Sequence, residues 1–186
     1  MKKRLFLKAL LLICFSSAAF ALKSDENVPA YISAESAEMD RSTGEGIYRH
    51  EVKIDQGTTH ITGEIVTTHN DKNNKIDEAV VNGNASSQAH YWTLPEADKP
   101  ELHARADVIR FYPQKQLVLL IGNASVAQGN NIIKSPRIEY DIEKQLLKSN
   151  QEPGKASART TIIINPNEGK GDLVAPRPKE PKGKKP

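Results

Sequence analysis

Alternating apolar and polar residues from position 47 to 66 constrain this chain more than any other feature of its sequence. Up to residue 56 the apolar residues share one parity, with charged residues between them: Tyr48, Val52 and Ile54. A period of two is typical of a strand with one buried face. Gly57 interrupts the alternation, and Ile61 and Ile65 resume it on the opposite parity. The stretch therefore predicts a β-hairpin.

The hairpin recurs 72 positions later, without a gap between the two copies. The matched positions include Ile54 with Val126, Gln56-Gly57 with Gln128-Gly129, and Ile61 with Ile133. An internal repeat commonly marks units that bury their apolar faces against each other. We therefore expect two β units of similar shape, stacked into one structure.

The first 21 residues predict a cleavable secretory signal peptide, with an uncleaved anchor as the alternative. Lys2, Lys3 and Arg4 precede an apolar run over 5–15, and small residues at 19 and 21 form a cleavage site. The single cysteine, Cys14, lies in this segment, so the exported chain has no disulfide and depends on its apolar core. Residues 22–27 are interpreted as a mobile leader.

Short strand patterns separated by turn residues fill the rest of the chain up to residue 165. Pro95 and Pro100 bound a loop between two halves, and no window after the signal has helical periodicity. This predicts an all-β domain over 28–165, folded as a sandwich, roll or solenoid. Residues 166–186 are rich in Pro, Gly and Lys and predict a disordered basic tail.

The net charge of +3 comes from the two ends of the chain. Without the signal and the tail, residues 22–165 contain sixteen basic and twenty acidic residues. A nucleic-acid-binding surface needs clustered Lys and Arg with stacking aromatics. The mildly acidic body excludes that class.

No catalytic, cofactor or metal site is predicted. The five histidines are scattered, and no zinc motif, nucleophile elbow or phosphate-binding loop is present. Asp40, Glu45 and Asp107 could converge as the acid and base of a carbohydrate-active enzyme on a β scaffold. That enzyme is the alternative from a different functional class.

The inward-facing positions of the predicted strands are mainly aliphatic and admit two interpretations. They form the closed core, or they line an open groove for acyl chains, in which each buried methylene contributes about 0.8 kcal/mol. The candidate groove residues are Ile32, Met39, Tyr48, Val52, Ile54, Ile61, Val66, Phe111, Leu120, Val126, Ile133, Ile138 and Tyr140.

The first and last strands of the domain are predicted to be unpaired edges. The last one, over 156–164, has little charge near its apolar tip to discourage pairing. If the edges lie at opposite ends, one molecule can add its last strand to the first strand of the next and build a filament. The candidate edge residues are Val28, Ala30, Ile32, Thr160, Ile162 and Ile164.

Four segments, in this order and spacing, resemble the OstA-like domain of the LptA family of periplasmic lipopolysaccharide-transport proteins. They are Ile32-Ser-Ala-Glu-Ser-Ala-Glu-Met-Asp40, Val52-Lys-Ile-Asp-Gln-Gly57, Leu120-Ile-Gly-Asn-Ala-Ser-Val-Ala-Gln-Gly129 and Arg137-Ile-Glu-Tyr-Asp141. The resemblance spans residues 28–164. The chain departs from the family pattern at His50-Glu51, where the second copy keeps the usual Gly122-Asn123.

The resemblance implies a twisted β-jelly roll, open at both ends, whose groove holds the lipid A acyl chains. It also implies head-to-tail oligomers that bridge the periplasm and carry lipopolysaccharide from the inner to the outer membrane. The implied partners are lipopolysaccharide, further copies of the chain, an inner-membrane Lpt subunit with a similar β domain, and the N-terminal domain of the outer-membrane translocon. A monomeric periplasmic lipid shuttle is the alternative.

Overall fold

The computed structural model describes residues 28–150 and 159–165. The predicted signal peptide (1–21), leader (22–27) and basic tail (166–186) lie outside these residues, as does the start of the predicted last strand. In the described residues no helix has the length and apolar character needed to cross a membrane.

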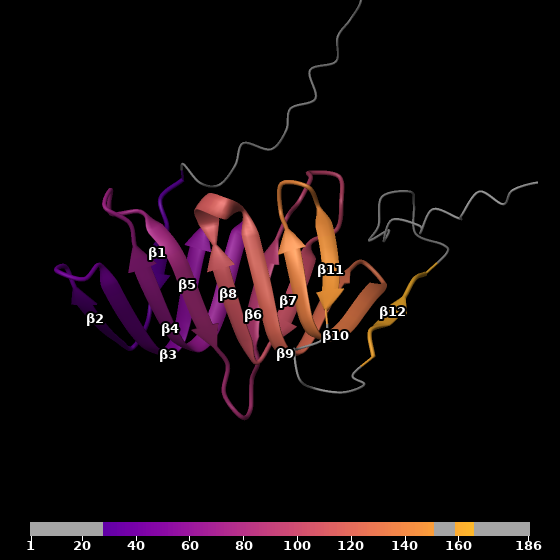
Figure 1. Ribbon diagram of the computed structural model, residues 1–186, viewed down its shortest axis with the longest axis horizontal. Helices are drawn as coiled ribbons and strands as arrows, with labels where there is room; N and C mark the ends of the chain where they lie inside the picture. The colour runs from indigo at the N-terminus through magenta and orange to yellow at the C-terminus, as the bar shows by residue number, and fades with distance from the viewer. Residues whose placement is uncertain (1–27, 151–158, 166–186) are drawn as a thin grey trace, which may run out of the picture.

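The fold is all-β, as the sequence predicts, and the helical element of the described residues is a single 3₁₀ turn at Pro113–Lys115. Figure 1 shows the strands side by side along the long axis of the molecule. They are β1 (Tyr31–Ser33), β2 (Ser36–Asp40), β3 (Glu45–Gln56), β4 (Thr59–Asn70), β5 (Ile76–Asn82), β6 (Ala89–Thr93), β7 (Leu102–Ala106), β8 (Val108–Tyr112), β9 (Leu117–Gln128), β10 (Asn131–Asp141), β11 (Leu146–Asn150) and β12 (Thr161–Ile163).

The strands form two layers that share their four longest members, β3, β4, β9 and β10. Layer A has the order β2, β3, β4, β5, β8, β9, β10, β11, and uses the first halves of β3 and β9 and the second halves of β4 and β10. Layer B has the order β1, β3, β4, β6, β7, β9, β10, β12, and uses the other halves. Antiparallel strands that pass from one layer to the other build a jelly-roll-like fold.

The shared strands cross between layers at a corner marked by two matching bulges. In β3, His50 and Glu51 have φ values of 65° and 48°, and in β9, Gly122 and Asn123 have values of 77° and 45°. The register of β3 against β4 shifts at the same point, between Arg49 and Val52. An extra residue in a bulge bends a strand and increases its twist, which directs each long strand from layer A into layer B.

The two bulges belong to the 72-residue repeat that the sequence predicts, and the structure contains that repeat. Strands β3 and β9 begin at residues 45 and 117 and have equal lengths of 12 residues. The corner hydrogen bonds recur as well. The Glu35 N–H donates to the His50 carbonyl (3.3 Å), and the Asp107 N–H donates to the Gly122 carbonyl (2.9 Å). Each half of the domain therefore makes the same fold around its own hairpin.

The core lies between the layers and is filled by the inward residues of both. The rings of Tyr91 in layer B and Phe111 in layer A lie 5.8 Å apart, so the layers are in contact across the interior. The core members outside the predicted groove set are mostly small: Ala79, Val81, Ala89, Tyr91, Leu102, Ala104, Ala106, Ile109, Val118 and Ala124.

Aspartates hold three turns at the edge of layer A that lies away from the corner. Asp40 Oδ1 accepts the Ser42 N–H (2.8 Å), Asp71 Oδ1 accepts the Lys75 N–H (2.9 Å), and Asp141 Oδ1 accepts the Lys144 N–H (2.9 Å). Such bonds replace backbone pairing in turns. The pKa of each carboxyl group lies below its usual value. The main causes are the Ser42 hydroxyl for Asp40, the Lys75 N–H for Asp71 and the Lys144 ammonium for Asp141, with the backbone bonds to Ser42 and Lys144 next.

We expect this protein to lose stability in acid because of these turns. A carboxyl group whose pKa is lower in the folded state stabilises the fold above its unfolded pKa of about 4, and this contribution is lost as pH falls through the folded pKa. The urea midpoint should therefore fall as the pH drops below about 4. Asp141→Asn should reduce that drop, and Asp98→Asn, at an exposed loop position, is the matched control. An equal acid response in both variants would contradict the assignment.

Candidate functional site

Eleven of the candidate groove residues lie on the inner faces of the two layers, where their parity places them. Their exposed fractions run from 0% for Val52, Val66, Leu120, Val126 and Ile138 to 8% for Phe111. Tyr48, Val66, Phe111, Leu120, Ile138 and Tyr140 come from layer A, whereas Val52, Ile54, Ile61, Val126 and Ile133 come from layer B. The sequence pattern therefore identifies the interior of the fold.

In the middle of the molecule this interior is packed by the protein's own side chains. Complete burial of residues from both layers means that the layers close on each other there, as in an ordinary core. Each interpretation of the inward residues, core or groove, therefore applies to a different part of the molecule. The central residues make the core, and any access to the apolar interior lies toward its ends.

One end of the interior is apolar and open to solvent. Ile32 of β1 pairs with Ile54 and is half-buried, so it continues the inner face of layer B to the edge. Met39 of β2 pairs with Gly46, on the inner side of layer A, and is 61% exposed. A Cβ at Gly46 would meet Thr68 Oγ1 at 2.7 Å and the Tyr48 hydroxyl at 2.9 Å, so glycine there leaves room for the Tyr48 ring.

The opposite end has the same character. Ile162 of β12 pairs with Ile133 and continues the inner face of layer B, with 47% of its surface exposed. In layer A, Leu147 of β11 pairs with Tyr140 and is partly buried against the core. Burial raises the pKa of the Tyr140 hydroxyl to about 12, with smaller contributions from the charges of Asp141 and Glu96. The apolar inner face therefore reaches the surface at both ends.

The candidate edge strands lie at these same two ends (Figure 1). Among the described residues β1 pairs with β3 alone, and β12 pairs with β10 alone. Five of the six edge residues are exposed, at 41% for Val28, 47% for Ile162 and 64% for Ile164, with Ala30 and Thr160 exposed as well, whereas Ile32 is half-buried. Thr160 Oγ1 donates to Ser149 Oγ (3.0 Å), which ties the last strand to β11.

Layer A has edges of its own, β2 and β11, which the sequence analysis did not single out. Each pairs with one strand among the described residues, β2 with β3 and β11 with β10. Glu38 and Asp40 make β2 acidic, whereas β11 carries Lys148. The sequence could have indicated these two edges. Strand β2 comes directly after β1 and β11 directly before β12, so both lie near the limits of the domain.

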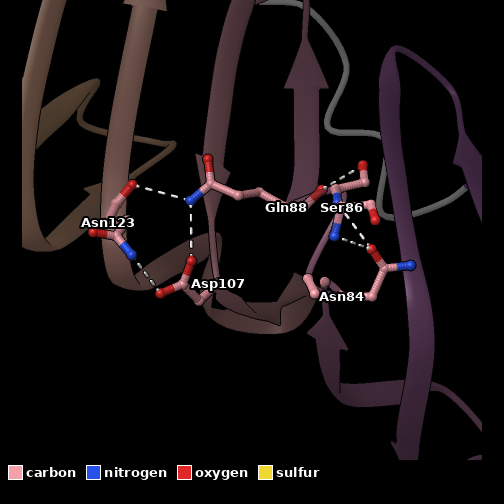
Figure 2. Close-up of a pocket in the computed structure, with 8 residues that line it drawn as sticks. Asn84, Ser86, Gln88, Asp107 and Asn123 are labelled. Atoms are coloured by element: carbon pink, nitrogen blue, oxygen red, sulfur yellow. Dashed lines mark hydrogen bonds between the residues drawn. The ribbon is translucent and has the colours of Figure 1, made fainter.

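The alternative acid–base set does not converge. Asp40 and Glu45 are opposite each other where β2 meets β3, and Asp40 is engaged with Ser42. Asp107 lies instead at the corner, in a polar hollow of about 690 Å³ (Figure 2). Its carboxylate accepts hydrogen bonds from Gln88 Nε2 (3.1 Å) and Asn123 Nδ2 (2.9 Å). These bonds join the β5–β6 loop to the second repeat and give Asp107 a structural role.

Comparison with known proteins identifies the family. Residues 31–146 match the family described as LptA/(LptD N-terminal domain) LPS transport protein. The chain belongs to this family. The match covers both repeats, both corner bulges and most of the apolar interior, so the LptA/LptD N-terminal family assignment rests on the same residues that build the fold.

Individual relatives agree with this assignment. The chain is 33% identical over 155 residues to the lipopolysaccharide export system protein LptH of Pseudomonas aeruginosa, covering 81% of this chain and 87% of the relative. It is 25% identical over 157 residues to LptA of Escherichia coli, covering 84% and 82%. The crystal structure of LptH, the LptA-homologous periplasmic component of the lipopolysaccharide transport device of P. aeruginosa, superposes with a TM-score of 0.72 at 30% identity, covering 77% of this chain and 100% of that one.

Proposed function

We propose that this member of the LptA/LptD N-terminal family is a periplasmic bridge that binds lipopolysaccharide and carries it from the inner to the outer membrane without catalysis of its own. The observation that carries the proposal is an apolar inner face that emerges at both ends of the molecule, beside edge strands that each have one partner within residues 28–150 and 159–165. Relatives named for lipopolysaccharide export support the ligand.

Acyl chains would enter where the layers are least tightly packed. The central residues are fully buried, so a chain must either part the layers or begin at an end beside Met39 and Ile32. Each methylene that leaves water contributes about 0.8 kcal/mol, so a few buried methylenes offset the loss of local packing between the layers. The shared strands join the layers at the corner. At the opposite edge the layers are joined by side chains, and Gln145 Nε2 donates to Glu96 Oε1 (2.9 Å), so an acyl chain that parts the layers must break this bond.

The position of the edge strands at opposite ends supports head-to-tail stacking. On the end that carries β1 and β2, strand β2 presents Glu38 and Asp40, with Arg49 paired to Glu38. The other end carries Arg159, and Lys148 paired to Glu139. Opposite charges favour contact between unlike ends over contact between like ends. Strand addition at unlike ends makes an open filament and joins the apolar inner faces into one path. The same edges would receive the similar β domains of an inner-membrane Lpt subunit and of the outer-membrane translocon.

A photo-crosslinking residue placed at single positions of β1 and β2 should show which face of these strands contacts lipopolysaccharide. On the inner face, positions 32 and 39 should label lipopolysaccharide during transport in cells. Positions 33 and 38 are their immediate neighbours on the outer face and are exposed, so they should label weakly. Glu38 is the stricter control, because it is at least as exposed as Met39. Equal labelling at 38 and 39 would refute binding to the inner face.

Two alternatives make different predictions. A monomeric lipid shuttle would bind lipopolysaccharide yet remain monomeric in light scattering at high concentration. A carbohydrate-active enzyme would lose turnover of a cell-wall glycan in Asp40→Asn or Asp107→Asn. We expect concentration-dependent oligomers, and no glycan turnover in either the unmodified protein or these variants.

A further inference from the structure

A row of stacked rings on the outer face of layer B takes no part in the proposed lipid path. His60, Trp92 and His103 are cross-strand neighbours on β4, β6 and β7. His90, two residues before Trp92 on β6, stacks on Trp92 with ring centroids 4.6 Å apart. The alternate residues of β6 are buried in the core, so this row faces outward, where its rings are half-buried.

Two of these rings place nitrogen atoms at the spacing of neighbouring metal ligands. His90 Nε2 and His103 Nδ1 are 3.1 Å apart and share a hydrogen bond, which a bound ion would replace. Two imidazoles bound to one ion at about 2.0–2.1 Å, with an angle of about 95–110° between the bonds, have nitrogens about 3.0–3.4 Å apart. The rings come from adjacent paired strands, so the sheet fixes their separation.

The surroundings of His103 suit the role of a metal ligand. Glu101 Oε2 lies 3.4 Å from His103 Nε2, on the far side of the ring from His90. A carboxylate there favours a proton on Nε2 and leaves Nδ1 as an acceptor, an arrangement common behind metal-bound histidines. Nδ1 can then accept a hydrogen bond from His90 Nε2 or bind a metal ion in its place.

We propose that His90 and His103 bind a divalent transition-metal ion on the outer face of layer B, with Glu101 as a positioning residue for His103. Among the described residues no group of three or more His, Cys, Asp or Glu side chains is placed to hold a metal, so water completes the coordination. Imidazole ligands suit copper, nickel and zinc, and copper(II) binds most tightly in that series. The ion links β6 to β7 and leaves the inner face unchanged.

Trp92 provides the measurement, because it is the single tryptophan of the chain and stacks on His90. The full exported chain, without an affinity tag, is titrated with copper(II) at pH 7. We expect saturable quenching of Trp92 fluorescence at one ion per chain. Zinc(II), which does not quench and binds less tightly, should restore the signal by competition when added in large excess, and magnesium(II) should have no effect. Quenching that rises linearly without saturation would overturn the proposal.

Variants locate the ion. His103→Ala should abolish saturable quenching, and Glu101→Gln should weaken apparent affinity about 10- to 100-fold. His60→Ala removes a ring stacked on the other side of Trp92, with centroids 5.1 Å apart, and should leave binding intact. Should His103→Ala fail to fold, zinc(II) should still shift the imidazole NMR signals of His90 and His103 alone in the unmodified protein. Binding that survives His103→Ala, or zinc shifts at other histidines only, would refute the assignment.

Discussion

Truncation after Gln151 is expected to abolish concentration-dependent oligomers of this protein. The truncation removes β12, whose three residues pair with residues 132–134 of β10 and present the free edge of layer B. In the proposed filament that edge receives β1 of the next molecule. About one net kcal/mol for each of three backbone hydrogen bonds corresponds to a loss of association of about 100-fold or more. Sedimentation or light scattering over a concentration series measures the change.

The newly exposed strand should not replace the one that is lost. Without β12, the edge of layer B is β10, which carries the exposed Lys134 and has Pro136 beyond it. Lysine and proline both discourage strand addition at an edge. Truncation after Pro166 is the matched control, since it removes most of the basic tail and keeps β12. Oligomers that persist in the shorter protein, or that disappear in both, would contradict strand addition through β12.

The period-two pattern was sufficient to predict the strands and their inner faces. Tyr48, Ile61 and Leu120 are buried where their parity places them, because successive side chains of a strand point to opposite faces. The 72-residue repeat could also be recognised from the sequence. Both copies have glycine with positive φ at the hairpin turn, Gly57 (59°) and Gly129 (56°). Strand faces and turns of this kind can be predicted because each depends on the type of residue at one position.

Contacts between the layers could not be predicted in the same way. Parity says that Val126 and Ile138 face inward, but it does not say how closely the opposite layer approaches, so core and groove remained equal interpretations. The stacked row of His60, Trp92 and His103 was equally hidden, because it depends on which strands are neighbours. Scattered histidines meet only after β4, β6 and β7 have paired.

The corner bulge of the second repeat should be far more sensitive to substitution than that of the first. Gly122 has φ of 77°, and a Cβ there would collide with the Asp107 carboxylate and lie 3.0 Å from both Cβ and Cγ of Asp107. Backbone strain alone costs about 1–3 kcal/mol for a non-glycine residue in this region. Gly122→Ala must also displace Asp107 from Gln88 and Asn123. We expect a loss of at least about 2 kcal/mol of unfolding free energy, measured by urea denaturation.

The first repeat shows why the same bulge accepts a side chain there. His50 occupies the matching position with φ of 65°, and its ring turns outward to Glu64, with Nδ1 2.8 Å from Oε1. His50→Gly relieves the strain of a left-handed non-glycine residue but increases the freedom of the unfolded chain, so the two effects nearly cancel, within about 1 kcal/mol. The two variants change matching positions in opposite directions and should differ in stability by at least about 1 kcal/mol. Equal losses in both would mean that the bulges tolerate side chains alike and that Asp107 does not lock the second corner.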